Sequence, residues 1–455
     1  MTQDKIKNYI VCINGGSGVI FQPMDEEFSY ILTATHVFDD IKDYKNKVEM
    51  YFYNESNNEF ELYPKFKLIK GENYFPHPNT DVDISILKIN RINNENKLII
   101  SSDFDNKGDY SLIGFPGIRR EKKKNKIDWI SDEKIERFTL SKTNDKREAE
   151  FNKAYTYEEI EGHSGGGIFK YDGEYVHLIG IENKIPVEGQ TQARIEFTPI
   201  VSFKKITDDS KGFLEDMLPF YMKNFSFLKE DVFQLPVDLI TKDTINKITN
   251  VLKAKTKEII ESDYTPNCIK DFLGDNQLLI SGQSQELIYE SILWCKWLEL
   301  ITIYSIAKEK KCTKSEFEKI FSEIRLLHSN TNSDFWMEHL EDISKTNFGN
   351  LSKDGIVIVS SKGLPHKDHY VLSKDSIPDI DRIRSNFESE NIEIPYGKEE
   401  INVANATNFP YDKYKFVHIE YFKQKLLVDN YKEYTNKNFT DILKHLKEKY
   451  EEIIK

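Results

Sequence analysis

The sequence has few cysteines and no long uninterrupted apolar run. Four cysteines, at positions 12, 268, 295 and 312, are scattered over 455 residues. A disulfide-stapled secreted domain is dense in cysteine, so this usage predicts free, buried thiols in a reducing cytosol. The most apolar stretch, residues 292–307, contains Lys296 and Glu299. It therefore favours a buried helix over a membrane span.

Positive charge is in the minority. The chain carries 76 acidic and 63 basic residues, for a net charge of −13. This balance argues against direct binding to nucleic acid. The first seven residues lack the apolar core of a signal peptide. Hydrophobic residues make up 39% of the chain, which indicates a globular protein. We therefore expect a cytoplasmic, multidomain protein without a membrane anchor.

One serine lies among glycines, in the run Gly162-His163-Ser164-Gly165-Gly166. Glycine permits positive φ and leaves room for a ligand, which suits a nucleophile beside oxyanion-binding N–H groups. The run also fits the G-x-S-x-G elbow of α/β-hydrolases, so an esterase of that class is an alternative. An elbow follows a buried strand and opens a helix, however. Here polar residues 156–161 precede the serine, and residues 168–181 resemble a hairpin.

Partners for this serine lie upstream. An apolar stretch ends in Thr-Ala-Thr-His at His36, and Asp83 directly precedes Ile-Ser-Ile-Leu. Asp81 is the rival carboxylate. A serine hydroxyl needs a base, which His36 would supply, and Asp83 would fix the imidazole tautomer. The order His, Asp, Ser differs from the Ser, Asp, His order of α/β-hydrolases.

These three motifs resemble those of trypsin-like serine proteases, and residues 110–117 look like the Gly-Tyr-Pro strand of bacterial members. The resemblance covers about residues 1–205. It implies an all-β double antiparallel barrel (chymotrypsin-like), with the triad His36, Asp83 and Ser164 in the cleft between the barrels. The backbone N–H groups of Gly162 and Ser164 would form the oxyanion hole. No metal or cofactor is implied. About six strands before residue 117 would make the first barrel.

The resemblance also indicates where specificity would arise. Glu158, six residues before the serine, would lie at the base of the substrate pocket, with Glu182 and Asn183 in its wall. Two carboxylates there would favour cleavage after Arg or Lys. The alternative is that both glutamates face solvent. His163 stands where digestive relatives have aspartate, so activation by a freed N-terminus is not expected.

Beyond a linker at residues 206–212, the apolar periodicity becomes helical. It predicts helices at about 243–260, 284–309, 314–328 and 334–345, and strands at 355–359 and 416–421. Residues 213–455 would thus form a helix-rich α+β domain. This region weakly resembles the C-terminal modules of bacterial three-component anti-phage conflict systems. We expect it to sense a signal or to dock a regulatory protein partner.

The sequence therefore predicts a cytosolic serine endopeptidase that acts on a protein substrate in bacterial defence or stress response. Its C-terminal domain would regulate the protease. The remaining alternative is a catalytically inert protease fold that serves as a binding module.

Overall fold

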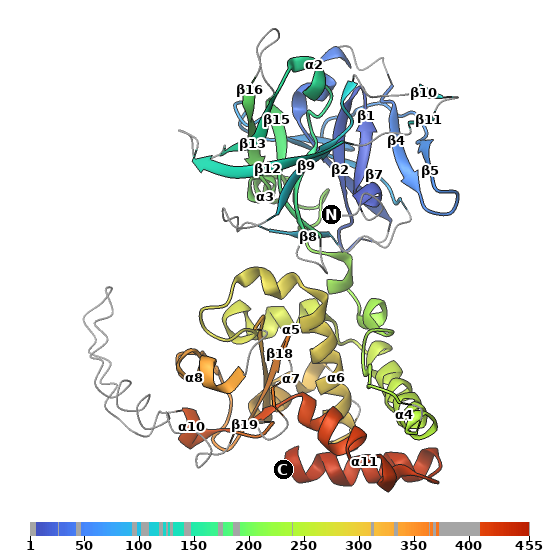
Figure 1. Ribbon diagram of the computed structural model, residues 1–455, viewed down its shortest axis with the longest axis vertical. Helices are drawn as coiled ribbons and strands as arrows, with labels where there is room; N and C mark the ends of the chain where they lie inside the picture. Colours follow the sequence, from blue (N-terminus) through green and yellow to red (C-terminus); the bar gives the residue numbers. More distant parts are fainter. Residues whose placement is uncertain are drawn as a thin grey trace, which may run out of the picture. The chain divides into compact units, whose positions relative to one another are not determined.

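The computed structural model divides into two compact units, Met1–Phe220 and Tyr221–Lys455 (Figure 1). The described residues are 6–25, 27–41, 47–92, 98–101, 109–117, 122–123, 126–127, 131–140, 147–171, 176–184, 192–238, 240–310, 314–331, 335–363, 365–366, 370–372 and 410–454. Cys12 and Cys295 are buried free thiols, Cys268 is a half-buried one, and Cys312 lies outside these residues.

The first sheet is antiparallel throughout and contains seven strands in the order β5-β4-β1-β2-β3-β7-β6. Its strands are β1 (Ile10–Ile13), β2 (Gly16–Phe21), β3 (Phe28–Thr33), β4 (Met50–Asn54), β5 (Glu59–Leu62), β6 (Tyr74–Pro76) and β7 (Ser85–Asn90). Alternate residues of these strands belong to different cores, because both faces of the sheet are covered. Val11 and Ile13 pack in one cluster, and Ile10 and Cys12 pack in another.

The second sheet closes on itself. Its order is β14-β9-β12-β13-β16-β15-β8, and β14 also pairs with β15. Its strands are β8 (Leu98–Ile100), β9 (Tyr110–Gly114), β12 (Ser131–Leu140), β13 (Arg147–Tyr155), β14 (Gly167–Tyr171), β15 (Val176–Lys184) and β16 (Gln192–Pro199). The strand at 110–114 was expected in the first barrel, but it pairs with β12 and β14. That expectation was wrong because strand spacing along the chain does not reveal pairing.

The predicted linker at 206–212 overlaps a helix. After η4 (Ile200–Ser202), α3 (Phe203–Asp209) contributes Phe203 and Ile206 to the core cluster that joins the two sheets. Leu214 belongs to the same cluster. The first unit therefore continues to Phe220, some residues beyond the predicted linker.

Helices dominate the second unit. They are α4 (Lys242–Ile260), α5 (Pro266–Leu273), α6 (Ser291–Lys308), α7 (Phe317–Glu323), α8 (Phe335–Ser344), α10 (Pro410–Lys413) and α11 (Phe439–Ile454), with a π-helix, η13, at Tyr421–Val428. Apolar residues cover all sides of α6, and most of it is buried, as befits a central helix. No helix among the described residues is long and apolar enough to cross a bilayer.

A parallel sheet completes the second unit. It contains β17 (Ile324–Ser329), β18 (Ile356–Ser361) and β19 (Lys415–His418), in that order. The predicted strands at 355–359 and 416–421 are present, although the second ends at His418. The helix expected at 314–328 ends at Glu323, and β17 takes its last residues. The antiparallel β-rich unit and the helix-rich α+β unit agree with the fold classes expected from the sequence.

Candidate catalytic site

His36 and Asp83 meet because their strands are neighbours. Strands β3 and β7 are antiparallel, and Thr33 at the end of β3 pairs with Ser85 at the start of β7. His36 follows β3 in η2 (Thr35–Ile41), and Asp83 precedes β7 by two residues. Antiparallel pairing therefore delivers both side chains to the same end of the sheet.

A single carboxylate holds the histidine at two points. Asp83 Oδ2 lies 2.5 Å from His36 Nδ1, and Asp83 Oδ1 accepts the backbone N–H of His36 at 3.0 Å. A carboxylate accepts hydrogen bonds, so Nδ1 carries the proton and Nε2 is left as the basic nitrogen. Asp81, the rival carboxylate, is exposed and makes no hydrogen bond to His36 among the described residues.

The same contact tunes the base. The hydrogen bond that His36 donates to Asp83 raises the pKa of His36 above its ordinary 6.5, although partial burial works in the opposite direction. The negative charge of Glu182 adds to the rise. The His36 side chain is 38% exposed, so solvent can reach it.

The Ser164 turn lies between the short helix α2 (Tyr157–Ile160) and β14. Strand β2 anchors it: the Ser17 N–H donates to Ser164 O at 2.8 Å, and Ser17 Oγ donates to Gly162 O at 2.7 Å. On the other side, the Gly165 N–H donates to Glu182 O at 2.8 Å. Backbone bonds to both sheets thus fix the turn, and Ser164 itself is half-buried.

Glycine is required where this turn meets the histidine strand. Gly165 has φ +85°, and a Cβ there would overlap Ser17 O and Thr33 Oγ1. A Cβ on Gly16 would lie 2.9 Å from both Ser164 O and a methyl group of Val37, the residue after His36. The Ser164 turn is therefore packed close to the start of η2.

The third member of the predicted triad lies on a turn close to Val37, the residue after His36, and makes no hydrogen bond to the His–Asp pair among the described residues. Within the described part of the chain, Ser164 Oγ makes no hydrogen bond to His36. Catalytic hydrogen bonds are often long in the absence of substrate and shorten when it binds.

Two backbone N–H groups of the turn are available to an oxyanion. The N–H groups of Gly162 and Ser164 donate no hydrogen bond to any described residue. The N–H of His163 between them donates to Ile160 O at 3.0 Å. The His163 ring is buried and also lies against Ile160 O, with Nδ1 at 2.9 Å. It thus packs against the end of α2.

The three predicted specificity residues differ in their surroundings. Glu182 is fully buried, and its N–H donates to Gly166 O at 2.9 Å, so it lies under the Ser164 turn. Asn183 is buried and donates through Nδ2 to Thr198 Oγ1 at 2.6 Å. Glu158 belongs to α2, but its side chain lies outside what the structure describes.

Sequence reasoning missed Ser17. This buried residue of β2 bonds to Gly162 and Ser164, and its Oγ accepts the Phe115 N–H at 2.8 Å. Its carbonyl accepts Thr33 Oγ1 at 2.7 Å. Its surroundings, Gly16-Ser17-Gly18, resemble an ordinary hairpin in the sequence. The only signal is a run of small residues at a point where another backbone approaches closely.

These features define a β-rich unit with a fixed His–Asp pair and a glycine-rich serine turn, joined to a helix-rich α+β domain. Residues 197–428, about half of the chain, match C-terminal domain 4 of the ABC-three component (ABC-3C) systems, and the chain belongs to this family. These are bacterial anti-phage defence systems, so the resemblance of the C-terminal region is confirmed. No curated protein matches the chain.

Proposed function

We propose that the first unit is a trypsin-like serine endopeptidase with Ser164 as nucleophile. The observation that carries this proposal is the 2.5 Å contact between His36 and Asp83, formed at strand ends beside the Ser164 turn. A buried or half-buried imidazole with its Nδ1 held by a carboxylate is the arrangement that activates a serine hydroxyl.

Each group acts twice, once when the tetrahedral intermediate forms and once when it breaks down. His36 Nε2 removes the Ser164 proton as the hydroxyl attacks the scissile carbonyl, and then donates it to the leaving amine. Asp83 stabilises the imidazolium. The N–H groups of Gly162 and Ser164 bind the oxyanion, and each such donor contributes about 10²–10³ in rate. Water then repeats the sequence on the acyl-enzyme.

The fold supports the same assignment. We infer a chymotrypsin-like double barrel because the catalytic groups come from the ends of β3 and β7 in one antiparallel sheet and from the turn before β14 in the other. The α/β-hydrolase alternative requires a helix after the serine and a parallel sheet. Here the strand β14 follows, and its pairings are antiparallel.

The proposed role follows from the family. The chain acts in the bacterial cytoplasm as the proteolytic component of an anti-phage system, and its C-terminal domain restrains the protease until a signal or partner protein arrives. The motivation is that a protease beside the cell's own proteins must be controlled, and that systems of three components supply partners. Glu182, with Asn183 and Glu158, favours substrates with Arg or Lys before the scissile bond.

The test is labelling of the full chain by a fluorophosphonate probe, alone and with the companion components of the system. We expect label on Ser164, none in Ser164→Ala or His36→Ala, and full label in Ser202→Ala, a half-buried serine of η4. Absence of label under every condition would favour the inert binding module. Cleavage of a peptide library then tests the preference for Arg and Lys.

A further inference from the structure

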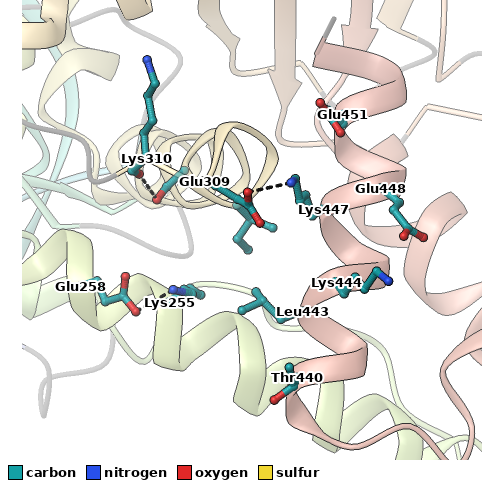
Figure 2. Close-up of a pocket in the computed structure, with 12 residues that line it drawn as sticks. Lys255, Glu258, Glu309, Lys310, Thr440, Leu443, Lys444, Lys447, Glu448 and Glu451 are labelled. Atoms are coloured by element: carbon teal, nitrogen blue, oxygen red, sulfur yellow. Dashed lines mark hydrogen bonds and ion pairs between the residues drawn. The ribbon is translucent and has the colours of Figure 1, made fainter.

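A groove in the second unit is lined by α4, the C-terminal end of α6 and one face of α11 (Figure 2). Its volume is about 630 Å³. Ile306 and Leu443 supply apolar surface, and lysines and glutamates form the rest of the lining. An apolar floor with a charged rim is a common surface for packing a helix.

Helix α11 has two distinct faces. Ile442, Leu446, Tyr450 and Ile454, each four residues apart, are buried against the unit. The stripe that lines the groove carries Lys444, Lys447, Glu448 and Glu451, at spacings of three, one and three. Residues at such spacings share one side of a helix. This stripe lies beyond residue 428, where the match to the ABC-3C domain ends.

The order of charges along this stripe changes sign about its centre. Two lysines come first and two glutamates follow, symmetrically about the point between Lys447 and Glu448. If a second α11 lies antiparallel to the first, residue 444 faces residue 451 and residue 447 faces residue 448. Every such pair joins opposite charges. A parallel arrangement in register would instead place like charges together, so of these two arrangements only the antiparallel one is complementary.

We propose that the groove is the interface of a homodimer in which a second copy of this chain places its α11 antiparallel to the first. The charges determine the orientation and register of the two helices, and the apolar side chains of Leu443 and Ile306 supply contact area. Two ion pairs already line the groove within one copy, one within α4 and one between α11 and the end of α6. Lys255 pairs with Glu258 on α4 at 2.8 Å, and Lys447 reaches Glu309 at 2.7 Å.

Lys444 offers the cleanest test. It is exposed and forms no ion pair among the residues that the structure describes. Lys447 is less suitable, because its loss would also remove the Glu309 contact. In the symmetric dimer, Lys444→Glu replaces two attractions with two repulsions between residues 444 and 451. Each exposed ion pair is weak, but two pairs change from attractive to repulsive at once. We therefore expect self-association to weaken about tenfold or more.

The experiment is sedimentation equilibrium of the full chain, with circular dichroism to verify folding. The wild type should dimerise, and Lys444→Glu and Glu451→Lys should each be weaker. The double variant should regain wild-type association, because exchanging the charges of residues 444 and 451 restores opposite charges in that pair. An equimolar mixture of the two single variants should form a heterodimer. A monomeric wild type would refute the proposal. A dimer unaffected by the single variants, or one that the double variant fails to restore, would assign the interface to another surface.

Discussion

At the scale of single residues, the candidate site depends on one carboxylate that fixes both the ring and the backbone of one histidine. Asp83 bonds to His36 Nδ1 and to its N–H, so the direction of the ring and the tautomer are determined together. A rotation of the Asp83 carboxylate that kept only one of these bonds would release either the ring or the backbone of His36. Asp83 therefore orients the His36 ring as well as interacting with its charge.

This contact predicts a pH dependence. The hydrogen bond to Asp83 raises the pKa of His36 above 6.5, and only the neutral ring can accept the Ser164 proton. The rate of probe labelling should therefore fall as the pH drops through that raised pKa. In Asp83→Asn the fall should move to lower pH, and the limiting rate should decrease about 10⁴-fold.

Asp81→Asn is the matched control, because Asp81 is exposed and does not bond to His36 among the described residues. Its profile should coincide with that of the wild type between about pH 5 and 9. An unchanged profile in Asp83→Asn would contradict the role given to Asp83.

The residue types of the site could be predicted from the sequence, but part of its support could not. Histidine, aspartate and serine each follow or precede a recognisable local pattern. Ser17 does not, because its importance comes from backbone groups of Gly162 and Phe115, which are 145 and 98 residues away along the chain. Glu182 is similar: it resembles a surface glutamate in sequence, yet the strand β15 buries it under the Ser164 turn.

At the scale of elements, the docking of the serine turn against β2 and β3 requires a residue without a side chain. Gly165→Ala would combine the strain of positive φ with an overlap on Ser17 O and Thr33 Oγ1. We expect a loss of stability above the roughly 1–2 kcal/mol of a left-handed residue alone, and a loss of labelling at Ser164.

Gly71→Ala separates these two effects. Gly71 has φ +81°, but a Cβ there would meet nothing within 4 Å. Gly71→Ala should lower the free energy of unfolding, measured in urea, only by the cost of positive φ. Labelling at Ser164 should stay intact. Equal effects of the two substitutions on labelling would show that the close approach at Gly165 is unimportant.

A second element-scale prediction concerns the π-helix η13. Lys423 on this helix lies 2.6 Å from Glu420 and 3.1 Å from Glu299 of α6, and Lys296 contacts both carboxylates. Burial opposes each charge, but the partners outweigh it: the pKa of Glu420 is lowered and that of Lys296 is raised. Glu299 also accepts the Phe233 N–H at 2.7 Å.

Lys423→Met would therefore leave buried carboxylate charge under-compensated. We expect the second unit to lose about 3–5 kcal/mol of stability in urea unfolding. Lys345→Met is the control, since Lys345 makes a comparable 2.6 Å contact with Glu341 at the surface. That exposed pair should contribute less than about 1 kcal/mol. Similar losses from both variants would argue against a special role for the buried cluster.

Two of the differences between the predicted and observed elements have a common cause. Residues 324–329 form an apolar run that periodicity alone cannot assign to helix or strand. Pairing with β18 over six residues makes it a strand. Likewise, the strand at 110–114 is recognisable, but its partners come from residues 131–135 and 167–170. Local pattern identifies elements, and long-range pairing decides their neighbours.

At the scale of the whole molecule, the chain contains two units with separate cores, and the boundary falls after Phe220. The sequence placed a linker at 206–212 because the run Thr-Asp-Asp-Ser-Lys-Gly is polar. That run instead ends a helix whose apolar residues continue the first core, and Leu214 continues it further. Polar composition indicated a surface segment but could not show on which side of it the packing ends.

Separate cores predict separate unfolding transitions. Ser17→Ala would leave Gly162 O and the Phe115 N–H without their partner inside the first unit, at a cost of about 1–3 kcal/mol. Lys423→Met acts inside the second. Because distant, independent sites have additive effects, each variant should lower one midpoint by about 2–4 °C per kcal/mol and leave the other unchanged. The double variant should show both shifts.

The two transitions can be assigned with probes that each unit carries. Three of the four tryptophans, at positions 294, 297 and 336, belong to the second unit, so fluorescence mainly reports its unfolding. Loss of fluorophosphonate labelling at Ser164 reports the first. If Ser17→Ala shifts the fluorescence transition as much as the loss of labelling, the units unfold as one body. In that case the stability of the proposed protease would depend directly on its ABC-3C domain, and regulation could act through folding itself.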